Sequence, residues 1–300
     1  MDFREQFLKA YYAKGGNRIV PERPVLPLLE LDEAFRISII NQKGGCGKTT
    51  TTINLASYLV EMGYSVLLVD SDPQAHLTLG LGLQGDSFDL TIYHLLLRSD
   101  LSATRVIQPT YHRNLKLIPS NGLLAAAQVE LLNLQSRDSL LKNKLGEVKR
   151  FFHFILIDCP PTLNLLTLNA LTASMSVIIP IQTQYYSLDG MRELFKTLEL
   201  VRQNSNPDLE ILGILPTLFD GRTKLNRAML HAIREYFQGQ VFETVIHLSS
   251  ALAECPMMGQ SIATYAPGSP GARDYRCFTE EVITRAARSN RSFERSQETV

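Results

Sequence analysis

The stretch of sequence that decides the fold is Asn41-Gln42-Lys43-Gly44-Gly45-Cys46-Gly47-Lys48-Thr49-Thr50. It follows a short apolar run, residues 37–40, and opens a longer amphipathic run, residues 50–62, so we expect a glycine-rich loop between a strand and a helix. Glycines allow backbone N–H groups to turn inward around phosphate oxygens, and the N-terminus of the following helix adds further donors and a positive dipole. The sequence therefore predicts a phosphate-binding loop (P-loop).

The polar side chains of this loop have expected roles in binding a nucleotide. We expect Lys48 to reach the β- and γ-phosphates and the Thr49 hydroxyl to ligate Mg²⁺. Further nucleotide contacts are expected from Gly44, Gly45, Cys46, Gly47 and Thr50. The loop departs from the ordinary pattern G-x-x-x-x-G-K-[ST], because Gln42 stands where that pattern has glycine and an additional lysine, Lys43, follows it. A second lysine beside the phosphates would be redundant if it served only its own site.

Two acidic side chains end the second apolar run, in Leu67-Leu68-Val69-Asp70-Ser71-Asp72-Pro73-Gln74. The carboxyl ends of parallel strands are where ligands bind in open α/β sheets. We expect Asp72 to orient the attacking water, because phosphoryl transfer depends mainly on placement and charge. Asp70 is expected to support the loop. The alternative is that both acids only cap a turn.

Another apolar run also ends in a carboxylate, in Phe154-Ile155-Leu156-Ile157-Asp158-Cys159-Pro160-Pro161. This is the form of a Walker B motif, and we expect Asp158 to hold Mg²⁺ through water, since Mg²⁺ gives up its hydration shell reluctantly. Cys159 could be read as a nucleophile, but a neighbouring acid raises a thiol pKa and does not lower it. We therefore expect Cys159 to be a small packing residue.

Short apolar runs alternate with longer amphipathic runs along most of the chain. Uninterrupted runs this short suit strands that are buried on both faces, as in a parallel sheet. Strands are expected at residues 37–40, 66–69, 115–118, 154–157, 177–181, 211–215 and 241–246. Helices are expected at residues 50–62, 123–134, 140–150, 165–173, 188–203 and 225–237. This alternation predicts an α/β fold, a doubly wound, mostly parallel sheet with helices on both faces.

Two segments lie outside this pattern. Residues 1–36 are expected to form an N-terminal extension, a short amphipathic helix followed by a proline-rich linker, with apolar residues at roughly helical spacing: Phe3, Phe7, Leu8, Tyr11 and Tyr12. We expect this helix to pack on its own domain or to be loosely ordered, with a partner-binding role as the alternative. The main domain is expected over residues 37–288, and residues 289–300 are expected to be a polar tail, with fraying after about Arg285.

Composition argues against several classes of protein. The formal net charge of the 300 residues is zero, so binding to nucleic acid must come from a local basic patch. The four cysteines, Cys46, Cys159, Cys255 and Cys277, include no C-x-x-C pair, which argues against a zinc site and a disulfide framework. Isolated thiols, with no signal peptide and no apolar run long enough to cross a bilayer, lead us to expect a cytoplasmic protein without a membrane partner.

These motifs resemble those of the ParA/Soj/MinD group of P-loop ATPases, and the likeness to the ParA/Soj family continues beyond them. The stretch from Lys43 to Thr49 is similar to that family's deviant Walker A box, K-G-G-x-G-K-[ST]. Further similar stretches are residues 158–161, 165–171, 179–182, 186–190, 253–262 and 265–269. The resemblance spans about residues 37 to 283 and leaves out the N-terminal extension.

The resemblance implies an ATPase that works as a dimer. Two subunits close face to face around two ATP molecules with Mg²⁺, and Lys43 crosses to the nucleotide of the facing subunit, where it assists catalysis together with Lys48 and Asp72. The closed dimer binds DNA non-specifically, and a ParB-like partner stimulates hydrolysis of ATP to ADP and phosphate, which releases the dimer. Such a protein is associated with the nucleoid and segregates or positions DNA or other cargo. Adenine is often read in this family by a late proline-containing segment, for which Pro216 and Pro267 are the candidates.

Four basic residues are the candidates for DNA contact: Arg222, Lys224, Arg227 and Arg273. The first three lie within six positions at the start of a predicted helix, and similar proteins carry DNA-contacting residues in the corresponding stretches. Such a small group of charges is usually a solvated helix start, so that reading stays open. A dimer would double the contacts with one polymer, and linked binding of this kind raises affinity.

Three alternatives remain. A MinD-like membrane-cycling ATPase shares the motifs but needs an amphipathic membrane helix, which the polar tail lacks and the N-terminal helix could supply. A related iron–sulfur carrier ATPase needs converging thiolates, and its C-x-x-C motif is missing here. A scaffold that holds ATP without hydrolysing it would need neither Asp72 nor Lys43.

Overall fold

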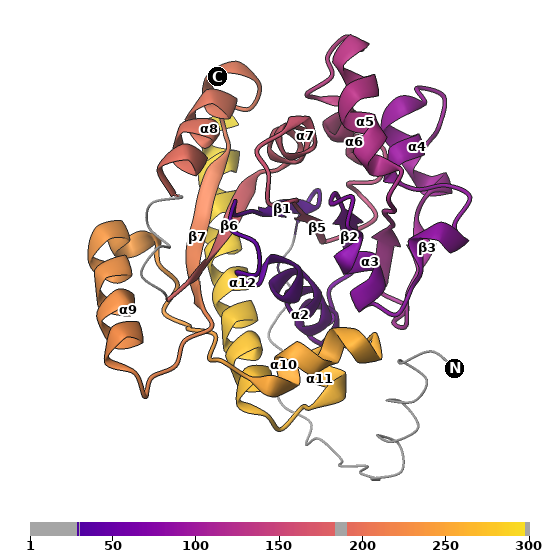
Figure 1. Cartoon of the computed structure of the whole chain (residues 1–300). Helices are drawn as coiled ribbons and strands as arrows, with labels where there is room; N and C mark the ends of the chain where they lie inside the picture. Colours follow the sequence, from indigo (N-terminus) through magenta and orange to yellow (C-terminus); the bar gives the residue numbers. More distant parts are fainter. Residues whose placement is uncertain (1–28, 30, 184–190, 298–300) are drawn as a thin grey trace, which may run out of the picture.

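The computed structural model describes residue 29, residues 31–183 and residues 191–297, with side chains as far as Ser289. Over these residues the chain forms a seven-stranded sheet in the order β3-β4-β2-β5-β1-β6-β7 (Figure 1). The strands are β1 (Phe35–Ile39), β2 (Val66–Asp70), β3 (Gln108–Pro109), β4 (Leu115–Ile118), β5 (Phe154–Asp158), β6 (Ser176–Gln182) and β7 (Glu210–Thr217). Every pairing is parallel except that between β3 and β4. The predicted mostly parallel sheet is therefore confirmed.

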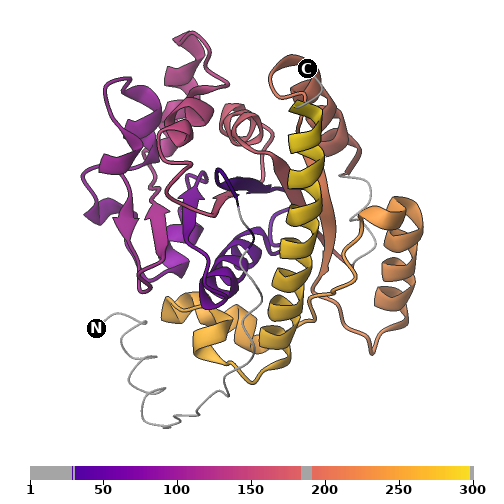
Figure 2. The ribbon, with the colours of Figure 1, turned by 180° about the vertical axis from the view of Figure 1, so that it is seen from behind.

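Helices cover both faces of this sheet (Figures 1 and 2). One face packs against α4 (Ile92–Leu97), α5 (Leu124–Glu130), α6 (Leu140–Gly146), α7 (Leu165–Ala173), α8 (Met191–Asn204) and α9 (Lys224–Phe237). The other face packs against α2 (Lys48–Glu61), α3 (His76–Gly80), α10 (Ser250–Glu254), α11 (Ile262–Tyr265) and α12 (Pro270–Gln297). On this second face α12 lies against α2, and Figure 2 shows α12 running alongside β7. The doubly wound architecture is confirmed.

Burial on both faces explains the composition of the central strands. Every residue of β2, β5 and β6 is buried. Along β5, Ile155 and Ile157 join the apolar cluster under α7, whereas Phe154 and Leu156 join the cluster under α2. A strand with two apolar faces requires an uninterrupted apolar run, which is the pattern that predicted it.

The two strands that end in acids lie side by side. In the register of β2 and β5, Asp70 is the partner of Asp158. β1 pairs with β5 on the other side, with Ile39 opposite Asp158. The phosphate-binding loop that follows β1 therefore lies at the same end of the sheet as both carboxylates, where ligands bind in open α/β folds.

The strand predicted at residues 241–246 is wrong. The segment runs beside β7, where the N–H of Ile246 donates to the carbonyl oxygen of Pro216 at 2.9 Å, but it forms only an isolated bridge. The N–H groups of residues 243 and 244 donate instead to the carboxylate of Glu281 in α12, at 2.9 and 3.1 Å. A side chain of another element thus takes the donors that a strand ladder would need.

The expected polar tail continues the last helix, because α12 extends to Gln297. Fraying after Arg285 stays a prediction. The Arg285 guanidinium donates to the carbonyl oxygens of Leu212 and Val241 at 3.0 and 2.7 Å. It also forms an ion pair with Glu281 at 2.9 Å. These contacts fasten α12 to β7 and to the segment beside it, and the polar composition of the tail does not reveal them.

The remaining predictions for helices divide into three groups. The helix predicted at residues 165–173 matches α7, and α2, α5, α6, α8 and α9 lie within the other predicted ranges or extend at most two residues beyond them. The short helices α3, α4, α10 and α11 were not predicted, because helical periodicity needs more than four to six residues to be recognised. The long helix α12 was not predicted either. The predicted N-terminal helix, its proline-rich linker and the stretch 186–190 lie outside the described residues. Within the described part of the chain, no helix is both long and apolar enough to span a bilayer.

Candidate nucleotide-binding site

The loop between β1 and α2 has the backbone geometry of an anion cradle. Gly45 and Gly47 have φ angles of +72° and +90°. Residues with a side chain rarely adopt this left-handed conformation. Alternation of left-handed and ordinary residues lets successive N–H groups converge on one anion. The glycines of the motif are therefore required by the shape of the loop.

Side chains from β6 and β7 hold this loop in place. The amide of Gln182 donates to the carbonyl oxygen of Gly45 at 2.7 Å. The hydroxyl of Thr217 donates to the carbonyl oxygen of Cys46 at 2.8 Å. Because these two carbonyl oxygens are bonded to the sheet, they are turned away from the space that a phosphate would take.

The two lysines of the loop are held in different ways. Lys48 is buried, and its ammonium donates to the carbonyl oxygen of Lys43 at 3.4 Å. The backbone of Lys43 is fixed a second time, since its N–H donates to the side chain of Asn41 at 3.0 Å. The half-buried Lys43 side chain, in contrast, has no hydrogen-bond or ion-pair partner in the parts of the chain that are described. Within the described part of one subunit, the charge of Lys48 is therefore directed to the loop, and the charge of Lys43 is not paired.

Thr49 and Asp158 form the second part of the site. The Thr49 hydroxyl donates to one carboxylate oxygen of Asp158 at 2.7 Å, and the Thr52 hydroxyl donates to the other at 3.1 Å. Burial raises the pKa of Asp158 to about 7, although the hydrogen bond from Thr49 and the charge of Lys48 oppose this rise. A hydroxyl and a carboxylate are the hard oxygen donors that Mg²⁺ takes beside phosphates. The donor set therefore fits the predicted metal.

Asp70 supports the neighbouring loop and does not line the cavity described below. Its fully buried carboxylate accepts hydrogen bonds from the N–H and the hydroxyl of Thr78, at 2.8 and 2.7 Å. Burial, and next the charge of Asp158, raise its pKa to about 7. This position fastens α3 to the end of β2.

Asp72 is placed differently, because it lines the cavity. One carboxylate oxygen accepts from the N–H of Gln74 at 2.9 Å, and its backbone carbonyl oxygen accepts from the Ser120 hydroxyl at 2.8 Å. Its other carboxylate oxygen has no hydrogen-bond partner among the described residues, although the side chain is only 8% exposed. A fixed carboxylate with one free acceptor suits the predicted task of orienting water, which stays a prediction.

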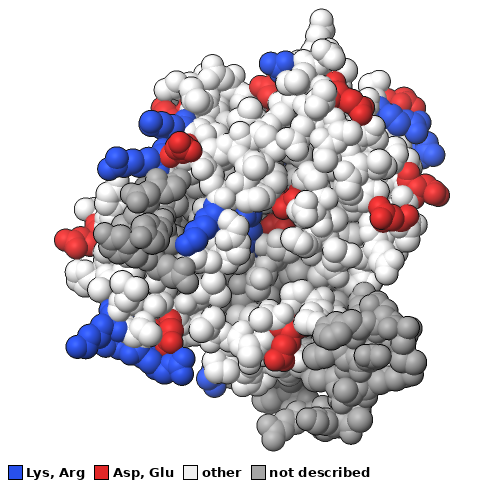
Figure 3. Space-filling model, viewed as in Figure 1, with Lys and Arg blue, Asp and Glu red and all other residues white. Residues whose placement is uncertain are grey.

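These elements surround a cavity of about 600 Å³. Its phosphate-binding end is lined by Gly44, Gly45, Gly47, Lys48, Thr49 and Thr50, with Asp72 and Pro161 beside them. A second, mostly apolar part of the lining, called its apolar end below, consists of Leu218, residues 246–249 and Leu252. Figure 3 shows the hollow near the centre of this face, with basic and acidic atoms at its edge. A cavity of this size has room for a nucleotide. Its charged part suits the phosphates, and its apolar part suits the nucleoside.

The apolar end differs from the sequence prediction. Neither Pro216 nor Pro267 lines the cavity in the described structure. Thr217 and Leu218, which follow Pro216, do line it, whereas Pro267 lies in the turn between α11 and α12. Residues 246–249 are not among the residues predicted for the site, and the strand expected at residues 241–246 overlaps them only at Ile246. The adenine-reading roles of the two prolines stay predictions.

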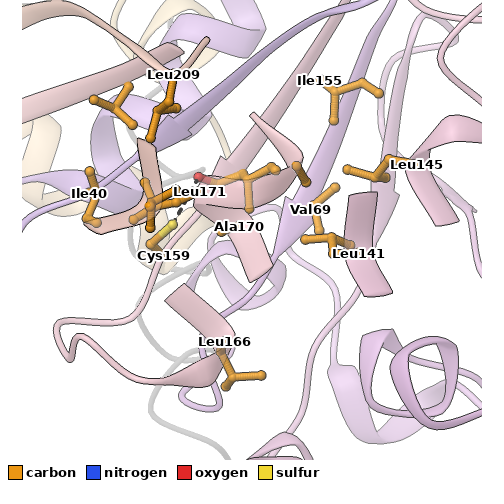
Figure 4. Close-up of a cluster of buried hydrophobic side chains, with 14 of the residues drawn as sticks. Ile40, Val69, Leu141, Leu145, Ile155, Cys159, Leu166, Ala170, Leu171 and Leu209 are labelled. Atoms are coloured by element: carbon orange, nitrogen blue, oxygen red, sulfur yellow. Dashed lines mark hydrogen bonds between the residues drawn. The ribbon is translucent and has the colours of Figure 1, made fainter. Parts of the chain in front are cut away.

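The prediction that Cys159 is a packing residue is confirmed. Cys159 is fully buried in the apolar cluster shown in Figure 4, where Ile40, Ala170 and Leu171 are neighbouring members. Burial, and then the charge of Asp158, raise its thiol pKa to about 12. A thiol with such a pKa is not a nucleophile near neutral pH.

The candidate DNA-binding cations lie outside the cavity and are all exposed: Arg222, Lys224, Arg227 and Arg273. Figure 3 shows basic atoms gathered at the lower left, over the loop that precedes α9. Arg222 is partly neutralised, because its guanidinium pairs with Asp220 at 2.8 Å. This hydrogen bond lowers the pKa of Asp220 to about 2.

One short segment connects these cations with the cavity. The N–H of Phe219 donates to the carbonyl oxygen of Ile246 at 3.1 Å, and the N–H of Leu248 donates to the carbonyl oxygen of Phe219 at 3.0 Å. The N–H of His247 donates to Asp274 of α12 at 2.9 Å. Because residues 246–248 also line the cavity, the loop before α9 and the first turns of α12 both join its apolar end.

Comparison with known proteins agrees with this geometry. A family model described as an AAA domain matches residues 35–211. The chain is 44% identical over 246 residues to the sporulation initiation inhibitor protein Soj of Bacillus subtilis, covering 82% of this chain and 97% of that protein. It is 43% identical over 249 residues to the chromosome partitioning protein ParA of Myxococcus xanthus, covering 83% and 88% of the two chains.

A solved structure resembles the chain over a similar length. Cobyrinic acid a,c-diamide synthase from Mycobacterium smegmatis, with a bound ATP analogue and magnesium, superposes with a TM-score of 0.73 at 35% identity, covering 82% of this chain and 93% of that chain. The residues matched by the family model, 35–211, include the phosphate-binding loop and both acidic strand ends. The chain belongs to the ParA/Soj family of chromosome-partitioning ATPases.

Proposed function

We propose that this chain is a Mg²⁺-dependent ATPase that closes as a dimer around ATP, binds DNA non-specifically in that state and is released when a ParB-like partner stimulates hydrolysis. Such a cycle would segregate or position DNA or other cargo on the nucleoid in the cytoplasm. The observation that carries the proposal is the pairing of a P-loop with two lysines in different environments. Lys48 turns into its own loop, while Lys43 has no partner among the described residues.

Each residue of the site has a task in this reaction. The loop amides and Lys48 bind the β- and γ-phosphates. Thr49 and Asp158 would hold Mg²⁺, whose charge offsets that of the β- and γ-phosphate oxygens. Asp72 orients the water that attacks the γ-phosphate, with the carboxylate oxygen that Gln74 leaves free. Placement and charge are the main requirements of phosphoryl transfer, so no covalent intermediate is needed.

Lys43 is assigned to the facing subunit. Its backbone is fixed on both sides by Asn41 and Lys48, so the start of its side chain is held on a rigid support. A cation that reaches another subunit's γ-phosphate acts like an arginine finger and stabilises the charge of the transition state. Dimerisation then becomes a condition for hydrolysis.

DNA binding is assigned to the cations around the loop before α9 and the start of α12. One subunit presents few of them, and Arg222 is partly neutralised by Asp220. Two linked copies on one polymer bind far more tightly than either copy alone. A chain without net charge can therefore hold DNA as a dimer and release it as a monomer.

Size-exclusion chromatography with light scattering tests the dimer and the DNA claims together. We expect a monomer with ADP, a dimer with Mg-ATP, and co-elution of the dimer with a DNA duplex of arbitrary sequence. Lys48→Ala is the control, because without this lysine the loop should bind no ATP and the protein should remain monomeric. A wild-type protein that binds Mg-ATP but stays monomeric would contradict the dimer proposal and leave nucleotide binding intact.

A further inference from the structure

His247 stands at the apolar end of the cavity with its ring fixed from two sides. Its N–H and its ring nitrogen Nδ1 both bond the same carboxylate oxygen of Asp274, at 2.9 and 3.0 Å. The ring of Phe219 packs edge-on against it, with centroids 5.5 Å apart and an angle of 67° between the planes. The His247 side chain is still 50% exposed, and the residue lines the cavity. A held but open imidazole is unusual for a residue whose only task is packing.

The contact with Asp274 decides which ring nitrogen can act. A carboxylate only accepts hydrogen bonds, so Nδ1 of His247 carries the hydrogen. In the neutral ring this leaves Nε2 as an acceptor. Within the described structure, no donor bonds to Nε2. The neutral form of His247 therefore offers one oriented acceptor in the lining of the cavity.

We propose that His247 recognises the nucleoside part of the bound nucleotide, with Nε2 accepting a hydrogen bond from a ribose hydroxyl or from the exocyclic amino group of the base. This inference rests on the proposed function, because it assumes that the phosphates occupy the loop. A neutral acceptor has no attraction for phosphate, which the amides and Lys48 hold at the other end. The neighbouring Leu218, Leu248 and Leu252 provide apolar surface on which a base can pack.

The test measures nucleotide affinity by calorimetry for the wild type and for His247→Phe, which keeps a ring against Phe219 but removes Nε2. The nucleotides are Mg-ATP, its 2′-deoxy and 3′-deoxy analogues, and purine riboside triphosphate, which lacks the amino group. We expect the substitution to weaken ATP binding about fivefold to tenfold, the effect of one lost hydrogen bond. One analogue should bind the wild type more weakly than ATP does, by a similar factor. The same analogue should bind His247→Phe with the same affinity as ATP does. That analogue identifies the donor.

Two further variants control the test. His231→Phe changes a histidine on α9 whose side chain is 80% exposed, and it should bind every nucleotide as the wild type does. Asp274→Asn should weaken ATP binding less than His247→Phe, because it loosens the ring without removing Nε2.

The inference is overturned if His247→Phe binds ATP with wild-type affinity. It is also overturned if, for every analogue, the fold-loss of affinity in His247→Phe equals the fold-loss in the wild type. The effects of the substitution and of the missing group would then be independent, and the ring would contact none of these groups. A wild-type protein that binds none of these nucleotides would overturn the proposed function and the inference together.

Discussion

The hydroxyl of Thr217 donates a 2.8 Å hydrogen bond to the carbonyl oxygen of Cys46, and so ties the last residue of β7 to the middle of the phosphate-binding loop. Both groups are almost completely buried. β7 is an edge strand of the sheet, two places from β1, the strand that precedes the loop. The loop is therefore shaped by a part of the chain about 170 residues away from it in the sequence, as well as by its own glycines.

Thr217→Val tests this tie. Valine has nearly the same shape but no hydroxyl, so the buried carbonyl oxygen of Cys46 loses its partner. We expect the free energy of unfolding to fall by about 1–2 kcal/mol and ATP affinity to fall several-fold. Urea unfolding and calorimetry measure the two effects. Thr197→Val on α8 is the control, since its hydroxyl bonds only its own helix, at Glu193, and both quantities should stay nearly unchanged.

Mixing two inactive variants tests whether Lys43 works in the facing subunit. Lys43→Ala and Asp72→Asn should each bind ATP and hydrolyse it more slowly than the wild type, on the order of a thousandfold for the lysine. In a mixed dimer, the site of the Lys43→Ala subunit keeps its own Asp72 and receives Lys43 from its partner. We therefore expect the mixture to regain measurable ATPase activity.

The control for this mixture pairs Lys43→Ala with Lys196→Ala, a change of an exposed lysine on α8 that leaves Asp72 intact. Because Lys196→Ala keeps both Lys43 and Asp72, it should hydrolyse ATP without the other variant. ATPase activity in that mixture should therefore not depend on mixing. If the mixture of the two inactive variants stays as slow as its components, Lys43 does not act across the dimer.

The buried carboxyl of Asp158 predicts a pH dependence of stability without nucleotide and Mg²⁺. Burial raises its folded-state pKa from 3.8 to about 7, so the folded protein holds this proton more strongly than the unfolded chain. The resulting stabilisation is complete below the unfolded pKa and is lost as the pH rises toward 7. Asp158→Asn cannot ionise, so its stability relative to the wild type should increase between about pH 4 and about pH 7.

Urea unfolding of both proteins over this range measures the effect. Asp70 has the same direction of shift, so Asp158→Asn should remove only part of the dependence. The control is Asp86→Asn, which changes an exposed carboxyl. Equal pH dependence in the wild type and Asp158→Asn would contradict the prediction.

Charge reversal at the loop before α9 tests the DNA surface. Arg222→Glu with Arg227→Glu should abolish retention of the ATP-bound protein on DNA at moderate salt, because phosphate contacts supply non-specific affinity. ATP binding should be unchanged, since neither side chain lines the cavity. Arg105→Glu with Arg113→Glu makes the same change of net charge at two other exposed positions and should preserve retention. Retention of the first variant would remove this loop from the DNA surface.

The pair of Arg222 and Asp220 predicts a change in the opposite direction. Asp220→Asn frees the guanidinium of Arg222 from a carboxylate 2.8 Å away. We expect DNA affinity to rise a few-fold and the dependence on salt to become steeper. Asp100→Asn is the matched control, because Asp100 pairs with Arg98 at 3.3 Å on another exposed part of the chain. Unchanged affinity in Asp220→Asn would show that Arg222 does not contact phosphate.

The sequence by itself determined the phosphate end of the site. Gly45 and Gly47 must be glycine because the loop needs their left-handed backbone. Asp158 is preceded by a run of apolar residues because it is the last residue of β5, a fully buried strand. A strand buried on both faces requires a continuous apolar run, so β2 and β5 could be recognised from composition alone. These requirements are local, and local requirements are visible in a sequence.

Only the tertiary structure decided the other end of the cavity. Residues 241–246 look like a strand, but the carboxylate of Glu281 takes two of their N–H groups. No sequence motif marks His247, and only the fold shows that it lies beside Asp274 and Phe219. The physical reason is that a side chain's hydrogen bonds and exposure depend on elements far away in the chain, and such partners leave no periodic pattern around the residue itself.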